Sequence, residues 1–120
     1  MSTAQYTTNQ DTSAIFEADL VDAEGDPVAA ASLSTLTLTL FDVGTDTIIN
    51  ARNLQNVLNT NNVTIDANGH LTFRAGVLDN PFLGSAPALH ELHHAVLAAT
   101  WPSGEGLTYV FEIDVQRTGR

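Results

Sequence analysis

The sequence predicts an all-β protein, a single antiparallel β-sandwich of about seven strands with one short helix near residues 52–58. Three observations lead to this fold class. Apolar and polar residues alternate in two segments, 34–41 and 107–116, and frequent turn signals separate other short apolar segments. A chain of 120 residues is long enough for one domain with one hydrophobic core.

The segment 34–41, Ser-Thr-Leu-Thr-Leu-Thr-Leu-Phe, gives the clearest signal. Successive side chains of a strand point to opposite faces, so Leu36, Leu38 and Leu40 are expected to be buried together. The threonines between them favour strands and tolerate water. We therefore expect a strand with one buried face and one solvated face, as is common in antiparallel sheets.

The chain before this segment also has strand and turn signals. Residues 14–21 predict a strand with Phe16, Ala18 and Leu20 on one face. The acidic segment 22–27 contains glycine and proline and predicts a turn.

Residues 52–58 break the period of two. Leu54, Val57 and Leu58 have the i, i+3, i+4 spacing of a helix, which predicts a short helix packed over an open end of the sheet. Farther along, Asn68-Gly69 lies between two alternating segments, which is a strong hairpin signal.

The C-terminal part predicts a loop and two strands. Residues 77–87 contain two prolines and are expected to form the loop. The apolar segment 95–101 and the alternating segment 107–116 are expected to be strands joined by a turn at 103–106. Phe111 and Ile113 of the last strand are expected in the core.

The expected organisation is a polar N-terminal arm (1–12), a sandwich domain (13–116) and a short tail (117–120). The arm lacks apolar periodicity, so we expect it to be disordered in the free monomer and to lie against another protein copy in an assembly. The sequence shows neither the pattern of a signal peptide nor an apolar stretch of about 20 residues that could span a membrane.

The chain is strongly acidic. It has 14 acidic residues against 4 basic residues, all arginines, and a formal net charge of −10. Such a surface repels phosphate, so neither nucleic acid nor an anionic membrane is an expected partner. An ordinary acidic surface and adaptation to high salt both agree with this charge, because salt screens self-repulsion. Without cysteine, the chain has no disulfide and no cysteine-based metal site.

The segment His90-Glu91-Leu92-His93-His94 matches the His-Glu-x-x-His pattern of zinc peptidases. On a helix, His90 and His94 would bind zinc, Glu91 would be the general base and Glu112 could be a third ligand. On a strand, the two histidines would lie about 13 Å apart, at about 3.3 Å per residue, too far to share one ion. The turn at Thr100-Trp101-Pro102 and the strands around it favour the strand, so we expect no zinc site.

Asp22, Glu24 and Asp26 resemble the start of a calcium loop, because alternate oxygen ligands can converge on a hard cation. Leu33 lies where the bidentate acid of such a loop belongs. We therefore interpret the segment as a solvated acidic turn and leave open whether it binds a cation.

The order of these segments resembles a known group of proteins. The segments are the acidic turn Asp-Ala-Glu-Gly-Asp-Pro-Val, the strand Leu-Thr-Leu-Thr-Leu-Phe-Asp, the hairpin Asp-Ala-Asn-Gly-His-Leu-Thr-Phe and the later His-His-Ala-Val-Leu-Ala-Ala-Thr-Trp-Pro-Ser-Gly. In this order the chain resembles small immunoglobulin-like structural proteins of tailed viruses and gene-transfer particles, over roughly residues 16–115. The resemblance implies an immunoglobulin-like sandwich without catalytic, cofactor or metal residues.

The function expected from this resemblance is that of a non-enzymatic virion protein. It would be a capsid decoration protein, or an accessory protein of a bacteriophage neck or tail, and it would dock in many copies. Its partners would be other virion proteins and copies of itself. Two alternatives stay open: a zinc metallopeptidase that uses His90, Glu91 and His94, and a β-sandwich module that binds carbohydrate or a host surface.

Overall fold

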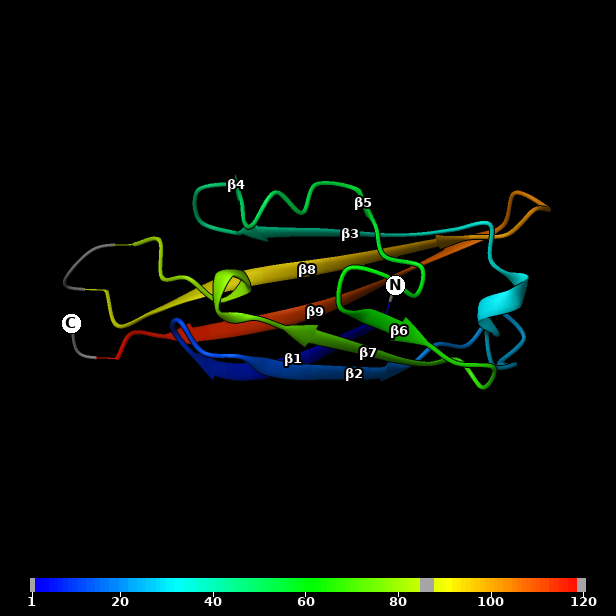
Figure 1. The fold of residues 1–120 in the computed structure, drawn as a ribbon, viewed down its shortest axis with the longest axis horizontal. Helices are drawn as coiled ribbons and strands as arrows, with labels where there is room; N and C mark the ends of the chain where they lie inside the picture. The colour runs from blue at the N-terminus through cyan, green and yellow to red at the C-terminus, as the bar shows by residue number, and fades with distance from the viewer. Residues whose placement is uncertain (1, 85–87, 119–120) are drawn as a thin grey trace.

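The computed structural model describes the chain except residues 1, 85–87 and 119–120, and it consists of two packed β-sheets (Figure 1). Residues 85–87 of the expected loop and residues 119–120 of the expected tail therefore lie outside the described part. The long axis measures 48 Å and the other two 23 and 21 Å. In the described residues, no helix combines the length and the apolar character that crossing a membrane requires.

The first sheet, called sheet A here, has the strand order β1-β9-β8-β3-β4, and β5 also pairs with β3. Its strands are β1 (Ser2–Asn9), β9 (Gly106–Gln116), β8 (His90–Thr100), β3 (Thr35–Asp42), β4 (Thr47–Ile48) and β5 (Gln55–Asn56). Sheet B has the order β2-β7-β6, with β2 (Ala14–Asp19), β7 (His70–Ala75) and β6 (Val63–Ile65). Two 3-10 turns, η1 (Ala30–Ser32) and η2 (Val77–Asp79), lie in the connections.

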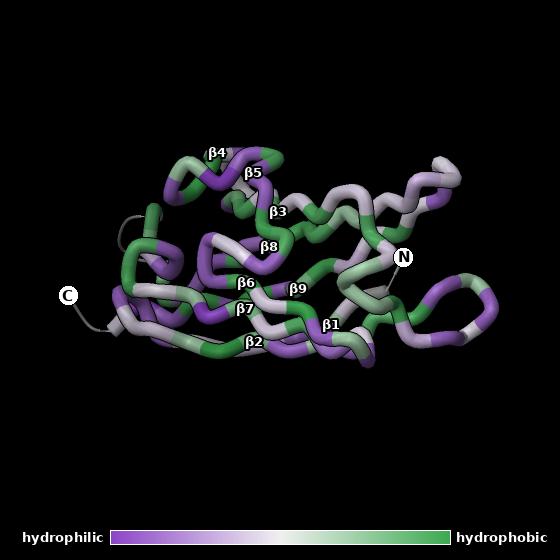
Figure 2. The backbone as a smooth tube through the Cα atoms, turned by 45° about the vertical axis from the view of Figure 1, so that its right-hand side comes forward, coloured by the Kyte–Doolittle hydropathy of each residue, from purple (hydrophilic) through white to green (hydrophobic). Residues whose placement is uncertain are grey.

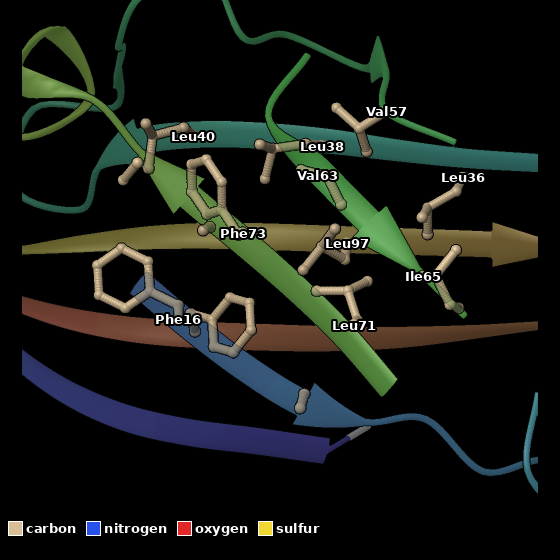
Figure 3. Close-up of a cluster of buried hydrophobic side chains, with 14 of the residues drawn as sticks. Phe16, Leu36, Leu38, Leu40, Val57, Val63, Ile65, Leu71, Phe73 and Leu97 are labelled. Carbon is tan, nitrogen blue, oxygen red and sulfur yellow. The ribbon is translucent and has the colours of Figure 1, made fainter. Parts of the chain in front are cut away.

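The core lies between the two sheets and confirms the predicted alternation. Leu36, Leu38 and Leu40 are at most 1% exposed, as are Phe111 and Ile113. Figure 3 shows side chains of both sheets meeting there, with Leu71 and Phe73 of β7 above the leucines of sheet A and Phe16 of β2 lying over β9. Figure 2 shows hydrophobic and hydrophilic segments along the whole backbone, and within β3 and β8 buried residues alternate with more exposed ones.

The predicted hairpin is also confirmed. β6 and β7 pair antiparallel, and Gly69 in the turn has φ +78°, a conformation that glycine adopts without steric cost. A Cβ atom at this position would lie 2.6 Å from the carbonyl oxygen of Leu20, so the turn packs tightly against the end of β2.

The expected helix at 52–58 is wrong. The segment is a loop that contains β5, and only Val57 of its three spaced apolar residues is fully buried, whereas Leu54 is 70% exposed. Ala51 and Leu54 have positive φ angles, which right-handed helices exclude. The loop follows the edge of β3 because backbone hydrogen bonds hold it there, from Leu40 N to Arg52 O and from Val57 N to Leu36 O.

Residues 1–12 do not form the separate arm expected from their polarity, because Ser2–Asn9 form β1 in the chain's own sheet. β1 pairs with β9 in parallel, so sheet A is mixed and not purely antiparallel. Tyr6 fixes the strand: its ring packs edge-to-face on Phe16 and Phe111, with centroids 5.0 and 5.7 Å away. Its hydroxyl donates to Glu17 O at 2.9 Å and accepts from Glu17 N at 3.1 Å. With β1 and β5, neither of which was expected, the described residues form nine strands instead of about seven.

Candidate functional site

The His-Glu-x-x-His segment lies at the start of β8, where alternation separates its residues. His90 and His94 project from the outer face of sheet A. Glu91 projects from the inner face, on the same side as the buried Ala95 and Leu97. The structure therefore does not bring His90, Glu91 and His94 together.

Each of the two outer histidines faces an acid on the neighbouring strand β9. His90 Nδ1 lies 3.2 Å from Asp114 Oδ1, and His94 Nε2 lies 3.5 Å from Glu112 Oε2. The ring of Phe41 on β3 packs edge-to-face against His94 at 5.7 Å. The ionisable groups on the outer face of β8 and β9 therefore gather at one end of sheet A, near the start of β8. Glu112, considered above as a third zinc ligand, pairs with His94 through Oε2, and its Oε1 accepts a hydrogen bond from Gln5 Nε2 at 3.4 Å.

On the inner face, Glu91 joins a buried cluster with His93 and Asp42. Glu91 Oε2 and His93 Nε2 are 2.5 Å apart, and Asp42 Oδ1 lies 3.9 Å from the same nitrogen. His93 is 0% exposed and Asp42 5%. β3 and β8 bring these two side chains together, because Asp42 and His93 are direct cross-strand partners.

The cluster fits an anchoring role better than a metal site. Asp42, Glu91 and His93 could each supply a ligand atom, all within 4.8 Å of one another. However, both oxygens of Glu91 already accept backbone hydrogen bonds, from Leu83 N and Gly84 N at 2.8 Å. His93 Nδ1 has no hydrogen-bond partner in the described residues, whereas a metal-bound histidine normally donates its other N–H. The cluster therefore ties the loop after η2 to the start of β8.

A second buried polar group, which the sequence did not indicate, joins two loops. Arg52 Nε and Nη2 lie 2.6 and 3.2 Å from the two carboxylate oxygens of Asp79, and the two residues are 4% and 2% exposed. Asn50 Nδ2 and Gly76 N donate to the same carboxylate. The guanidinium also packs over the ring of Phe73 at 5.1 Å. This network fixes the loop between β4 and β6 against η2.

The acidic turn at 22–26 has a local role that its sequence explains. Asp22 Oδ1 accepts hydrogen bonds from Glu24 N and Asp26 N, both at 2.9 Å, which closes the turn. Ligand oxygens of Asp22, Glu24 and Asp26 come within 4.8 Å of one another, but they lie on an exposed turn where acidic residues are common. The structure adds nothing there that points to a bound cation.

On sheet B, His70 lies between two acidic side chains that favour its protonated form. His70 Nδ1 lies 2.9 Å from Asp19 and Nε2 3.4 Å from Glu17. Hydrogen bonds to Asp19 and, next, to Glu17 raise the pKa of His70 above its ordinary value. In the adjoining turn, backbone N–H groups of His70 and Asn68 bond to Asp66 and lower the pKa of that carboxyl.

A shallow groove of about 550 Å³ lies between the end of β2 and the β8–β9 hairpin. Tyr109 is the one aromatic residue that lines it, and burial raises the pKa of its hydroxyl. Trp101 packs against the core instead.

Beyond its charged end, the outer face of sheet A is uncharged in the described residues. The register of β1, β9, β8 and β3 places uncharged, mostly small side chains side by side there. We call this surface the threonine face; it consists of Thr3, Thr35, Thr37, Thr39, Val96, Ala98, Thr100 and Thr108, with the buried Val110 beneath it. It carries no charge, although the chain has a formal net charge of −10.

Comparisons with protein families and with curated proteins found no relative of this chain. No protein-family model matches the chain, and no curated protein matches it.

Proposed function

We propose that this chain is an immunoglobulin-like, non-enzymatic structural protein of a virion, which docks in many copies on capsid, neck or tail proteins. The strand order supports the immunoglobulin-like part of the proposal. Immunoglobulin domains pack a sheet containing their second, fifth and fourth strands on a sheet containing their third, sixth and seventh. Here β2-β7-β6 faces β9-β8-β3, and β4 extends the second sheet as in variable-type domains.

The observation that carries the docking proposal is the threonine face. A chain of charge −10 repels copies of itself and other acidic proteins over most of its surface. An uncharged surface of threonine, valine and alanine side chains has no such repulsion, and its side chains lose little conformational entropy on contact. The alternation of β3 and β8 produces this surface, because the same strands bury leucine and alanine on the inner side.

The experiment measures incorporation into particles. Tagged wild-type chain, Thr37→Arg and Thr64→Arg would be supplied during virus production, and the copies per purified particle would be counted by quantitative mass spectrometry. Thr37 lies on the threonine face and Thr64 on the outer face of β6, so the two variants introduce the same charge on opposite faces.

We expect many copies per particle for the wild type and Thr64→Arg, and a loss of about tenfold or more for Thr37→Arg, because burying an unpaired charge is costly. Circular dichroism of both variants checks that they fold. Absence of the wild-type chain from purified particles would refute the virion role, and equal incorporation of both variants would refute docking through the threonine face.

A further inference from the structure

The four sheet edges of the described structure differ in how they are protected. Exposed edges invite pairing with another chain, and proteins usually blunt them with short strands, charges or irregular backbone. β4 and β5 have two residues each and are joined by residues with positive φ angles. β6 has three residues, and β2 carries Glu17 and Asp19. Only β1 is long, with eight residues, Ser-Thr-Ala-Gln-Tyr-Thr-Thr-Asn, and free of charge.

The hydrogen-bonding pattern shows which groups of β1 are free. Gln10 N donates to Gln116 O, and in a parallel ladder alternate residues bond to the same neighbour. The backbone N–H and C=O groups of the even-numbered residues of β1 therefore point toward β9. Those of Thr3, Gln5 and Thr7 point the opposite way, toward the open edge of the sheet. The odd-numbered Asn9 fits this pattern, because its carbonyl points away from β9 and accepts a hydrogen bond from the Thr12 hydroxyl.

We propose that β1 pairs with β1 of a second copy of this chain, in antiparallel orientation about a twofold axis at Gln5. In this register Gln5 is opposite Gln5 of the second copy, and Thr3 is opposite Thr7. Threonine pairs across antiparallel strands are favourable, and Ala4 opposite Tyr6 combines a small residue with a large one on the inner side. The two copies of sheet A become one continuous sheet, with both threonine faces on the same side.

The absence of charge on β1 favours a second copy of this chain as the strand that pairs with it. A basic peptide would be attracted to an acidic strand, but β1 offers no carboxylate to it. Two copies of a chain with charge −10 can approach closely only through an uncharged surface, and like charges directly opposite would destabilise the pair. The self-complementary order of Thr3, Gln5 and Thr7 supplies that surface.

β1 already has its extended strand conformation in the single chain. The Tyr6 contacts to Phe16, Phe111 and the backbone of Glu17 hold it in place. The dimer therefore does not lose the entropy of ordering a flexible segment, which strand addition by a disordered arm would cost.

The test is the mass of the purified chain in solution, by sedimentation velocity over a range of concentrations. We expect the wild type to dimerise, and to do so more strongly as salt screens the repulsion between the two acidic copies. Gln5→Pro removes the outward N–H from both copies and leaves the hydrogen bonds to β9 in place. It should raise the dissociation constant roughly tenfold to a hundredfold, because two hydrogen bonds are lost.

Two controls make the outcome decisive. Gln5→Ala keeps the N–H group and should still dimerise, and circular dichroism should show that both variants fold. The chain has no cysteine, so Gln5→Cys introduces a single thiol that should form a disulfide-linked dimer on oxidation, because cross-strand Cα atoms lie about 5.5 Å apart. Ser103→Cys, on an exposed turn far along the sheet, should not.

A wild-type chain that stays monomeric at all salt concentrations would overturn the proposal. So would dimers that Gln5→Pro leaves intact, since they would use another surface. These measurements need no particle, so failure here leaves the virion proposal standing, and failure to enter particles leaves the dimer standing.

Discussion

The buried ion pair between Arg52 and Asp79 gives the sharpest prediction about stability. Asp79→Ala removes the carboxylate that both Nε and Nη2 of Arg52 contact, and the guanidinium stays buried, with 4% of the residue exposed. Only Nη1 keeps partners, the side chain of Gln55 and the carbonyl of Asn61. Breaking such a pair by removing one partner costs about 3–5 kcal/mol, because an uncompensated charge is left inside.

This loss is large relative to the whole protein. Native domains are stable by about 5–15 kcal/mol, so Asp79→Ala is expected to remove about a fifth of that stability or more. Arg52→Met should cost less, because methionine keeps an apolar contact to Phe73, and Asn50 and Gly76 still donate to the carboxylate of Asp79. The double variant should cost less than the sum of the two single changes, since neither charge is then left unpaired.

The assay is urea unfolding, followed by the fluorescence of Trp101, the one tryptophan of the chain, which packs against the core. Glu105→Ala, in an exposed turn, is the control and should change stability by about 0.5 kcal/mol or less. A loss below about 1 kcal/mol for Asp79→Ala, or costs that simply add in the double variant, would refute the reasoning that this pair is buried and coupled.

Three further predictions follow from the core, a turn and a titratable group. Leu38→Ala should cost about 2–5 kcal/mol by transfer and cavity terms, and an unchanged urea midpoint would contradict its burial. Gly69→Ala should destabilise far more than Gly104→Ala: both have positive φ, but only at Gly69 would the new Cβ clash, 2.6 Å from the Leu20 carbonyl oxygen. Equal melting temperatures for the two variants would contradict that contact. The raised pKa of His70 contributes stability fully below about pH 6.5, and this contribution is lost as pH rises through the folded-state pKa. His70→Gln should therefore lower the melting temperature near pH 5.5 but not near pH 8.5, and a pH-independent difference would contradict the charge pairing.

The parts of the fold that sequence predicts are those where one local rule decides. In β3 the alternation of leucine and threonine determines both the element and its buried face, and each leucine is buried as expected. In the β6–β7 hairpin, the positive φ at Gly69 is a conformation that the Asn-Gly pair supplies locally. Neither inference needs information about distant residues.

The parts that sequence missed depend on contacts between distant residues. β1 looks like a polar arm because most of its residues are polar. It is a strand because Tyr6 reaches Phe16, Phe111 and the backbone of Glu17. The Arg52–Asp79 pair joins residues 27 positions apart, and only the fold brings them together. One sequence feature could have indicated the pair: Arg52 is the one charged residue in a loop rich in asparagine, which suggests that it has an acidic partner elsewhere in the chain.

The His-Glu-x-x-His segment shows how the period of an element decides what a motif can do. With 3.6 residues per turn, positions i and i+4 share a face and Glu91 would lie near both histidines. With a period of two, Glu91 shares its face with His93, a residue that the zinc pattern leaves unspecified, and the observed contact joins these two side chains. The pairing of β8 with β3 then adds Asp42 through direct cross-strand register. The same five residues therefore form two histidine–acid pairs on the outer face and one buried anchor on the inner face. The contacts of these residues therefore follow from the alternation of a strand and not from the spacing of the zinc pattern.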